Sequence, residues 1–344
     1  MAPVMPLMPP FQYRRRFTVL RRRIGALPRS HGAGAAAACL LLAIAMHAVL
    51  AQTPPTTGTT IVLTQEPITP IAPPPSADPL KLGLGEELFA SRLLSHGGTQ
   101  SCVSCHDVHH SGADGRQHDI GSDGKPLKFN TPSVFNAALS FRLNWEGNER
   151  TLEAQAALAI DGGPGLGTSV PEVVARLNAN PDIVKRFVAA YGRGPDQSSL
   201  VNALATYERS LVTPDSPFDR WLKGDKGALS AQQLNGYALF KSFGCVSCHQ
   251  GMNVGGNMFQ RQGIFHRLAS PTPEVLRVPS LRNVATTAPY FHDGSEPTLA
   301  GAIRKMAAAQ LDQTLSGQEI DAIVAFLRSL TGNYRGAAVK AAAQ

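Results

Sequence analysis

The pentapeptide CVSCH occurs twice in this chain of 344 residues, at positions 102–106 and again at positions 245–249. When such a Cys-x-x-Cys pair lies on the first turn of a helix, both thiols can add to the two vinyl groups of one haem. The histidine that follows then faces the iron as its proximal ligand. The two copies therefore predict two covalently bound c-type haems, held by Cys102, Cys105 and His106 and by Cys245, Cys248 and His249.

Three other readings of a Cys-x-x-Cys pair are a redox-active dithiol, a zinc knuckle and a disulfide. None of them requires a histidine directly after the second cysteine, and both copies have one. Two identical copies in a chain with an export signal favour haem attachment over these alternatives.

The N-terminal segment 1–51 has the features of an export signal. It contains seven arginines and no acidic residue, and an apolar run ends at the small residues Val49 and Ala51. The alternative is an uncleaved membrane anchor. Export agrees with haem attachment, because c-type cytochromes mature on the outer face of the bacterial inner membrane, so we expect a periplasmic protein. The fifth cysteine, Cys39, would leave with the signal.

Outside the signal the chain carries 25 basic and 25 acidic residues, so nothing favours binding to nucleic acid. Residues 52–79 are rich in Pro and Thr and predict an extended linker. The rest is helical in pattern. Segments beginning at Ser230 and Ser316 open with capping boxes completed by Gln233 and Glu319, and the second carries the apolar stripe Ile320, Ile323, Leu327 and Leu330.

The expected fold is mostly α, with two cytochrome-c-like haem domains in one chain. The turn-rich segment 213–227 marks the boundary between them. We place the N-terminal haem domain at 80–220, the C-terminal haem domain at 221–333 and a flexible tail at 334–344.

Several ordered motifs resemble the bacterial di-haem cytochrome c peroxidase/MauG family over roughly residues 80–332. They are LGEELFASRLLS, SCVSCH, GADGR, NTPSVFNAA, VPSLRNVATTAPYFHDGSEPTLAGAI and IVAFLRSLTG. The resemblance implies a peroxidatic first haem, bound by His106, and an electron-transfer second haem, bound by His249.

The resemblance also implies a second axial ligand for the second haem, at Met306 in AIRKMAAAQL. A thioether ligand raises the potential of a haem relative to a second imidazole. MauG resembles the peroxidases but has a Tyr at this position, so Met306 points away from MauG. Without the family register, a core methionine would be the simpler interpretation. Met252 and Met258 lie closer in sequence but match no role.

At the first haem, the resemblance implies that the amide of Gln155 holds the peroxide and that Trp145 lies between the haems. Trp145 could equally be a packing aromatic. The catalytic Glu of the family would fall at Gly165, where the acid is missing. Asp161 and Glu172 are the nearest substitutes, although Glu172 also suits a helix cap.

The histidine that ligates the oxidised first haem in many family members corresponds here to Ser122, in the stretch Ile120-Gly121-Ser122. A hydroxyl is a poor ligand for haem iron, so we expect the reductive switch to be absent or rebuilt. His109 and His110 follow the proximal turn too closely to cover the opposite face. His118 could reach it, or all three could be loop histidines.

Weaker matches concern an inter-domain calcium site and the haem surroundings. The resemblance implies calcium bound by Asn130 and the carbonyls of Thr287 and Pro289, although Asn130 could also be only a turn residue. It places His292 near the haems and implies that Arg282 pairs with a haem propionate.

Three functions follow, in order of preference. The first is a periplasmic enzyme that reduces hydrogen peroxide to water at the His106 haem, with electrons that enter at the His249/Met306 haem from a small cytochrome c or a cupredoxin. The second is a MauG-like oxidant that modifies a partner protein. The third is a non-catalytic electron-transfer cytochrome. Family members commonly form homodimers, so a dimer is a further expectation.

Overall fold

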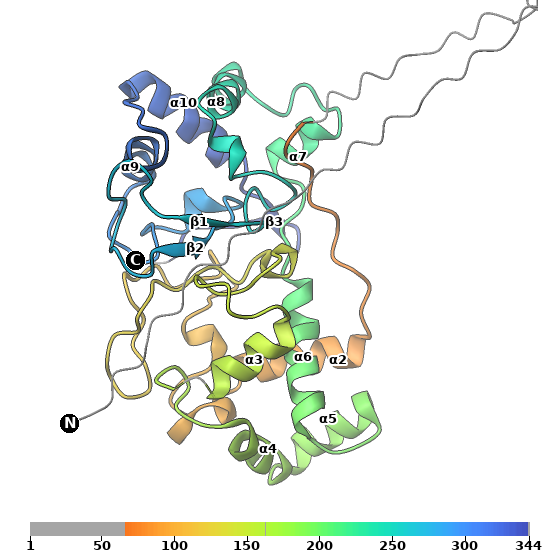
Figure 1. Cartoon of the computed structure of the whole chain (residues 1–344). Helices are drawn as coiled ribbons and strands as arrows, with labels where there is room; N and C mark the ends of the chain where they lie inside the picture. Colours follow the sequence, from red (N-terminus) through yellow and green to blue (C-terminus); the bar gives the residue numbers. More distant parts are fainter. Residues whose placement is uncertain (1–65, 162, 343–344) are drawn as a thin grey trace, which may run out of the picture. The chain divides into compact units, whose positions relative to one another are not determined.

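The computed structural model describes residues 66–161 and 163–342 (Figure 1). The expected export signal 1–51, Cys39 and the first part of the linker, 52–65, lie outside the described residues. Within the described part of the chain, no helix combines the length and apolar character needed to cross a membrane.

Helices make up most of the regular structure, as predicted. The N-terminal half contains α2 (Pro79–Ala90), α3 (Leu152–Asp161), α4 (Val170–Asn178), α5 (Pro181–Tyr191) and α6 (Gln197–Ser210). The C-terminal half contains α7 (Pro217–Leu222), α8 (Ala231–Ser242), α9 (Leu299–Leu311) and α10 (Gly317–Arg328). Short 3-10 turns are η1 (Arg92–Leu94), η2 (His96–Gly98), η3 (Cys102–Ser104), η4 (Ala137–Leu139), η5 (Cys245–Ser247) and η6 (Val284–Thr286).

Two small antiparallel ribbons complete the fold. Strand β1 (Phe259–Arg261) pairs with β2 (Val275–Arg277), with Phe259 opposite Arg277. Strand β3 (Asn333–Tyr334) pairs with β4 (Ala337–Ala338). Each strand has at most three residues, which is too short to give an alternating pattern in the sequence.

Each half has its own hydrophobic core. In the first, α2 packs on α6 so closely that a Cβ at Gly85 would lie 2.1 Å from the carbonyl oxygen of Ala203. In the second, a Cβ at Gly236 on α8 would lie 1.9 Å from the carbonyl oxygen of Ala322 on α10. In Figure 1, α2 to α6 accordingly form one group and α7 to α10 another.

The two predicted capping boxes are present. The Ser230 hydroxyl accepts from the Gln233 amide at 3.3 Å, and the Gln233 side chain accepts from the Ser230 amide at 2.8 Å. Ser316 and Glu319 make the same exchange at the start of α10. The stripe on α10 faces the second core, where Ile320, Ile323, Leu327 and Leu330 are all buried.

At the predicted boundary between the halves, the chain contacts the second core. Helix α7 begins at Pro217, and its Phe218 is fully buried in that core. The domain limits 80–220 and 221–333 stay a prediction.

The end of the linker is a packed strap rather than a free tether. Ile68 and Ile71 are buried, and Ile68 joins the second core. The Glu66 carboxylate accepts from the Tyr237 hydroxyl at 2.6 Å. In Figure 1 this orange segment runs from beside α7 to the start of α2. The strap therefore covers the C-terminal domain before the chain enters the N-terminal one.

The described residues of the predicted tail, 334–342, contact the first core. Val339 is buried in that core, and the Tyr334 ring lies 5.0 Å from the Phe135 ring. Two side chains of the tail therefore pack against the N-terminal half. That core belongs to the opposite end of the sequence, so the local pattern did not reveal it.

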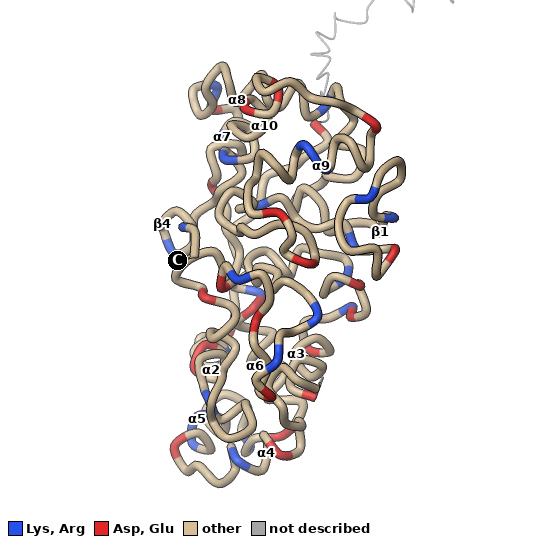
Figure 2. The backbone as a smooth tube through the Cα atoms, turned by 90° about the vertical axis from the view of Figure 1, so that its left-hand side faces the viewer, with Lys and Arg blue, Asp and Glu red and all other residues tan. Residues whose placement is uncertain are grey.

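Charged residues of both signs are scattered along the described chain, with no extended face of one sign (Figure 2). This distribution agrees with the balanced composition outside the N-terminal segment.

Candidate haem sites

The two CVSCH copies fold into the same turn. In the first, the amides of Cys105 and His106 donate to the carbonyl of Cys102 at 3.2 and 2.9 Å. In the second, the amides of Cys248 and His249 donate to the carbonyl of Cys245 at 3.3 and 3.0 Å. The prediction placed each pair on the first turn of a helix, and the structure reduces that helix to one 3-10 turn.

Among the described residues, no disulfide joins the cysteines of either motif. Burial raises the pKa of Cys102 and of Cys105 to about 12 and that of Cys245 to about 11. A redox dithiol needs a thiolate near neutral pH, so the raised pKa values of Cys102, Cys105 and Cys245 do not favour that chemistry. Their environment fits thiols that become thioethers.

Both histidines are oriented in the same way. The Nδ1 atom of His106 lies 3.2 Å from the carbonyl oxygen of Gly112, and Nδ1 of His249 lies 3.3 Å from that of Val254. A backbone carbonyl at Nδ1 fixes the tautomer that leaves Nε2 free for a metal. Burial also lowers the pKa of His249 to about 4, which keeps its ring neutral, as a ligand must be. The residues present therefore fit a haem at each motif.

Ser122 lies against the glycine-rich loop 163–167. Its amide and its hydroxyl donate to the carbonyl of Pro164, at 2.6 and 3.0 Å, and the amide also lies 3.2 Å from the carbonyl of Gly165. The approach is so close that a Cβ at Gly167, where φ is +65°, would lie 2.1 Å from the Ser122 hydroxyl. The two positions that depart from the family pattern, Ser122 and Gly165, are thus neighbours.

The two candidate substitutes for the missing acid are engaged elsewhere. The Asp161 carboxylate accepts from the Val170 amide at 2.6 Å. Glu172 completes the capping box of α4 with Ser169 and is exposed. Both carboxylates stabilise the start of α4, and the interpretation of Glu172 as a cap is confirmed.

The three nearby histidines have different surroundings. The Nδ1 atom of His110 lies 2.6 Å from the Asp107 carboxylate, and His109 is on the same exposed turn. His118 is half-buried, and its Nδ1 has no hydrogen-bond partner among the described residues. Gln155 lies half-buried on α3.

Two buried carboxyl groups near the first motif were missed by the sequence interpretation. Asp119 is 1% exposed and accepts from the Thr131 hydroxyl, and burial raises its pKa to about 8. Glu208 is 7% exposed on α6, and burial raises its pKa to about 8 as well. Glu208 falls one helical repeat after Leu204, on the apolar stripe of α6, and that position could have revealed it.

Trp145, Asn130 and His292 come together between the two halves. The Trp145 indole nitrogen donates to the carbonyl of Asn130 at 2.8 Å, and the Asn130 amide donates to the carbonyl of His292 at 2.9 Å. The Trp145 and His292 rings are 6.3 Å apart, edge to face. Nε2 of His292 is buried without a partner among the described residues, as expected of a side chain beside a space that a cofactor fills.

The expected calcium ligands are partly engaged within the protein. The Asn130 side-chain amide donates to the carbonyl of Arg116 at 2.7 Å, which leaves its side-chain oxygen for another partner. Thr287 and Pro289 lie in the segment that follows η6. Calcium at these residues stays a prediction.

Met306 lies half-buried on α9, whose Ala302 and Ala307 pack in the second core. Met252 is 37% exposed, and Met258 is half-buried beside β1. Ligation by Met306 stays a prediction as well.

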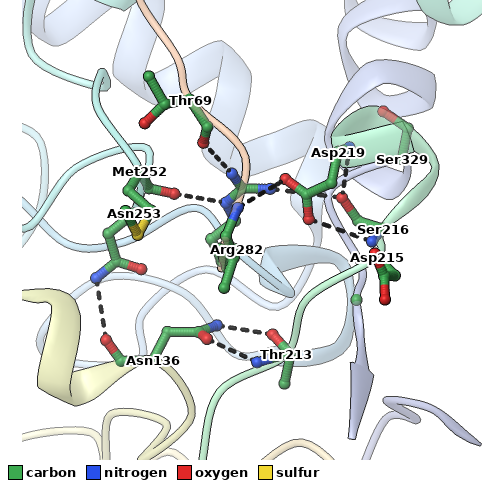
Figure 3. Close-up of polar contacts among 12 residues, drawn as sticks. Thr69, Asn136, Thr213, Asp215, Ser216, Asp219, Met252, Asn253, Arg282 and Ser329 are labelled. Carbon is green, nitrogen blue, oxygen red and sulfur yellow. Dashed lines mark hydrogen bonds and ion pairs between the residues drawn. The ribbon is translucent and has the colours of Figure 1, made fainter. Parts of the chain in front are cut away.

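Arg282 has several protein partners (Figure 3), and its predicted pairing with a haem propionate stays a prediction. Its Nη1 lies 2.8 Å from the Asp219 carboxylate, and both side chains are at most 1% exposed. Its Nε and Nη2 donate to the carbonyls of Met252 and Thr69, each at 2.8 Å. Figure 3 shows these contacts converging on one guanidinium, which joins the strap, α7 and the loop after the second haem motif.

Comparison with known proteins agrees with this arrangement. The family model described as di-haem cytochrome c peroxidase matches residues 79–227, and the cytochrome c model matches residues 233–331. The chain is 39% identical to the cytochrome c peroxidase Ccp of Escherichia coli over 292 residues, which is 78% of this chain but only 62% of that protein.

Two further relatives are covered more completely. The cytochrome c551 peroxidase of Nitrosomonas europaea is 37% identical, over 79% of this chain and 86% of that protein. The crystal structure of a MauG-like protein associated with microbial copper homeostasis superposes with a TM-score of 0.67 at 28% identity, over 76% of this chain and 93% of that one. With two cytochrome c-type domains and oxidoreductase relatives along most of its length, this chain belongs to the bacterial di-haem cytochrome c peroxidase/MauG family.

Proposed function

We propose that this protein is a periplasmic peroxidase that reduces hydrogen peroxide to water with electrons from a small cytochrome c or a cupredoxin. Electrons enter at the C-terminal haem, held by His249 and Met306, and are used at the N-terminal haem, held by His106. Trp145, between the two halves, lies on the path between them.

The observation that carries this proposal is the position of Ser122. Its hydroxyl donates to the carbonyl of Pro164 at 3.0 Å, so the residue at the family's histidine position is fixed to a loop and is no iron ligand. Peroxide can bind at a haem only where the iron has a free coordination position. With Ser122 held by this loop and His118 not bound to the iron, the first haem would be open in the oxidised protein and would need no reductive activation.

Few side chains near the first haem motif are available to act on the peroxide. A haem bound at His106 would supply the electrons that reduce the peroxide. The Gln155 amide, on α3, would orient the peroxide by hydrogen bonding, as the family resemblance implies. Gly165 brings no acid, and Asp161 and Glu172 cap α4. Proton transfer then relies on water or on another carboxyl group, so we expect slower turnover than a positioned acid would give.

The spin state of the ferric protein as isolated tests the open site. We expect one high-spin and one low-spin haem in electron paramagnetic resonance, and consumption of peroxide without prior reduction when a reduced donor is supplied. Two low-spin haems that are inert to peroxide would instead support the electron-transfer cytochrome.

The missing acid favours a second candidate, a MauG-like oxidant of a partner protein. After peroxide is added in the absence of a donor, that function predicts a long-lived oxidised state and a partner with a modified Trp or Tyr. Rapid return to the ferric spectrum with reduced donor, and no modified partner, supports the peroxidase.

A further inference from the structure

Arg277, the last residue of β2, is a buried cation without a counter-charge. Its side chain is 7% exposed. Its Nε donates to the carbonyl of Asn144 at 3.0 Å, and its Nη1 lies 3.4 Å from the carbonyl of Val278. Both acceptors are neutral. In residues 66–161 and 163–342, Nη2 has no protein acceptor and Arg277 has no ion pair with a carboxylate, although Nη2 itself is not one of the fully buried atoms without a partner.

A buried guanidinium in this state is unfavourable unless an anion is added. Burial lowers the pKa of Arg277 to about 10, so the group still carries its charge at neutral pH. Burying a charge is tolerated when an opposite charge compensates for the lost water. Arg282, five residues later and equally buried, has this compensation from Asp219. Among the described residues, Arg277 has no carboxylate that could do the same.

The position of Arg277 indicates which anion is missing. Its backbone amide donates to the carbonyl of Trp145 at 2.9 Å. On another side of the same tryptophan lies His292, which is 3% exposed and whose Nε2 has no partner among the described residues. Two buried nitrogen-bearing groups with unused hydrogen-bonding capacity thus flank Trp145.

Hydrogen bonds and close contacts connect both haem motifs with the surroundings of Arg277 and Trp145. On the neighbouring strand, Gln260 Nε2 lies 3.9 Å from the Cys248 sulfur. On the side of the first motif, the loop after His106 reaches Asn130 through the carbonyl of Arg116, and Asn130 receives the Trp145 hydrogen bond. A haem carries two propionate carboxylates, and the planar fork of a guanidinium matches a carboxylate bidentately.

We propose that Arg277 binds a haem propionate beside Trp145, with His292 as a second partner, and that it is a positioning residue for that haem. The carboxylate comes from either the first or the second haem. The inference rests on haem attachment at the two CVSCH motifs and does not require peroxide turnover.

The test is the midpoint potential of each haem in Arg277→Gln. Loss of a buried positive charge favours the ferric, more positive state, so the potential of the haem that Arg277 serves shifts to lower values. The haem whose potential moves is the source of the propionate. Arg261→Gln is the matched control, because Arg261 lies on the partner strand β1 but is exposed and paired with Glu274. Its potentials stay at the wild-type values.

A folded R277Q protein with two haems and two unchanged potentials would overturn the proposal and leave Arg277 as a clamp on the carbonyl of Asn144. If R277Q does not fold, Arg277→Lys provides the test, because lysine keeps the positive charge but cannot bind a carboxylate bidentately as a guanidinium does. We expect the resonance Raman propionate-bending band of one haem to shift in R277K, and an unshifted band overturns the proposal. Neither measurement involves peroxide, so a protein that fails as a peroxidase still gives an answer.

Discussion

Replacing Asp219 by Asn tests whether the buried ion pair between Asp219 and Arg282 stabilises the fold. The pair joins Arg282 Nη1 to Asp219 Oδ1 at 2.8 Å, with 1% and 0% of the two side chains exposed. Asn keeps the shape and one acceptor but leaves the guanidinium without a counter-charge. Breaking a buried pair in this way costs about 3–5 kcal/mol. We therefore expect Asp219→Asn to lower the free energy of unfolding by that amount.

The assay is urea denaturation of the haem-loaded protein, followed by circular dichroism. Asp215→Asn is the control, because Asp215 pairs with Lys223 at 2.9 Å on the surface, where such a pair contributes about 0–1 kcal/mol. A loss no larger than that of the control would refute the reasoning, because Arg282 would then not depend on Asp219 for its counter-charge.

Three further outcomes are expected. Gly236→Ala should destabilise the protein by about 1–3 kcal/mol in urea, because its Cβ would lie 1.9 Å from the carbonyl oxygen of Ala322, whereas Gly317→Ala, with nothing within 4 Å, should not. Ser122→His should convert the high-spin ferric haem to a low-spin haem in optical and paramagnetic resonance spectra, and peroxide consumption should then depend on prior reduction. An unchanged spin state would count against the correspondence of Ser122 with the family's histidine ligand. Glu208 has a pKa raised from 4.5 to about 8, so its contribution to stability is complete below pH 4.5 and is lost as the pH rises through 8. Between about pH 5 and pH 9, the free energy of unfolding of Glu208→Gln should therefore rise relative to that of the wild type by a few kcal/mol, on the order of the pKa shift. Urea denaturation at each pH measures this difference, and a difference that does not change with pH would contradict the prediction.

Local sequence was a good guide wherever neighbouring residues determine the structure. The capping boxes at Ser230 and Ser316 depend on residues three positions apart, and both form as predicted. The two haem motifs are equally local, and each histidine finds its carbonyl partner within six residues. These features could be predicted because the interacting groups lie within one or two turns of chain.

Features that depend on distant packing could not be predicted in the same way. The tail residue Val339 enters a core built from the other end of the chain. Arg282 meets Asp219 across 63 residues, so its carboxylate partner is not visible in the sequence nearby. Arg282 and Arg277 lie five residues apart, yet Arg282 pairs with the Asp219 carboxylate and Arg277 has no carboxylate partner among the described residues.

The contact between Ser122 and the loop 163–167 has a consequence for how this protein could be changed. The two family residues that it lacks would occupy adjoining positions, yet the structure treats them differently. A Cβ at Gly165 would meet only the carbonyl of Ala159, at 3.7 Å, whereas the Ser122 hydroxyl already fills the space beside Gly167. An acid at position 165 therefore needs no rearrangement of the backbone nearby. A histidine at position 122 gives up the hydrogen bond from the Ser122 hydroxyl to the carbonyl of Pro164, so it is the more disruptive of the two substitutions.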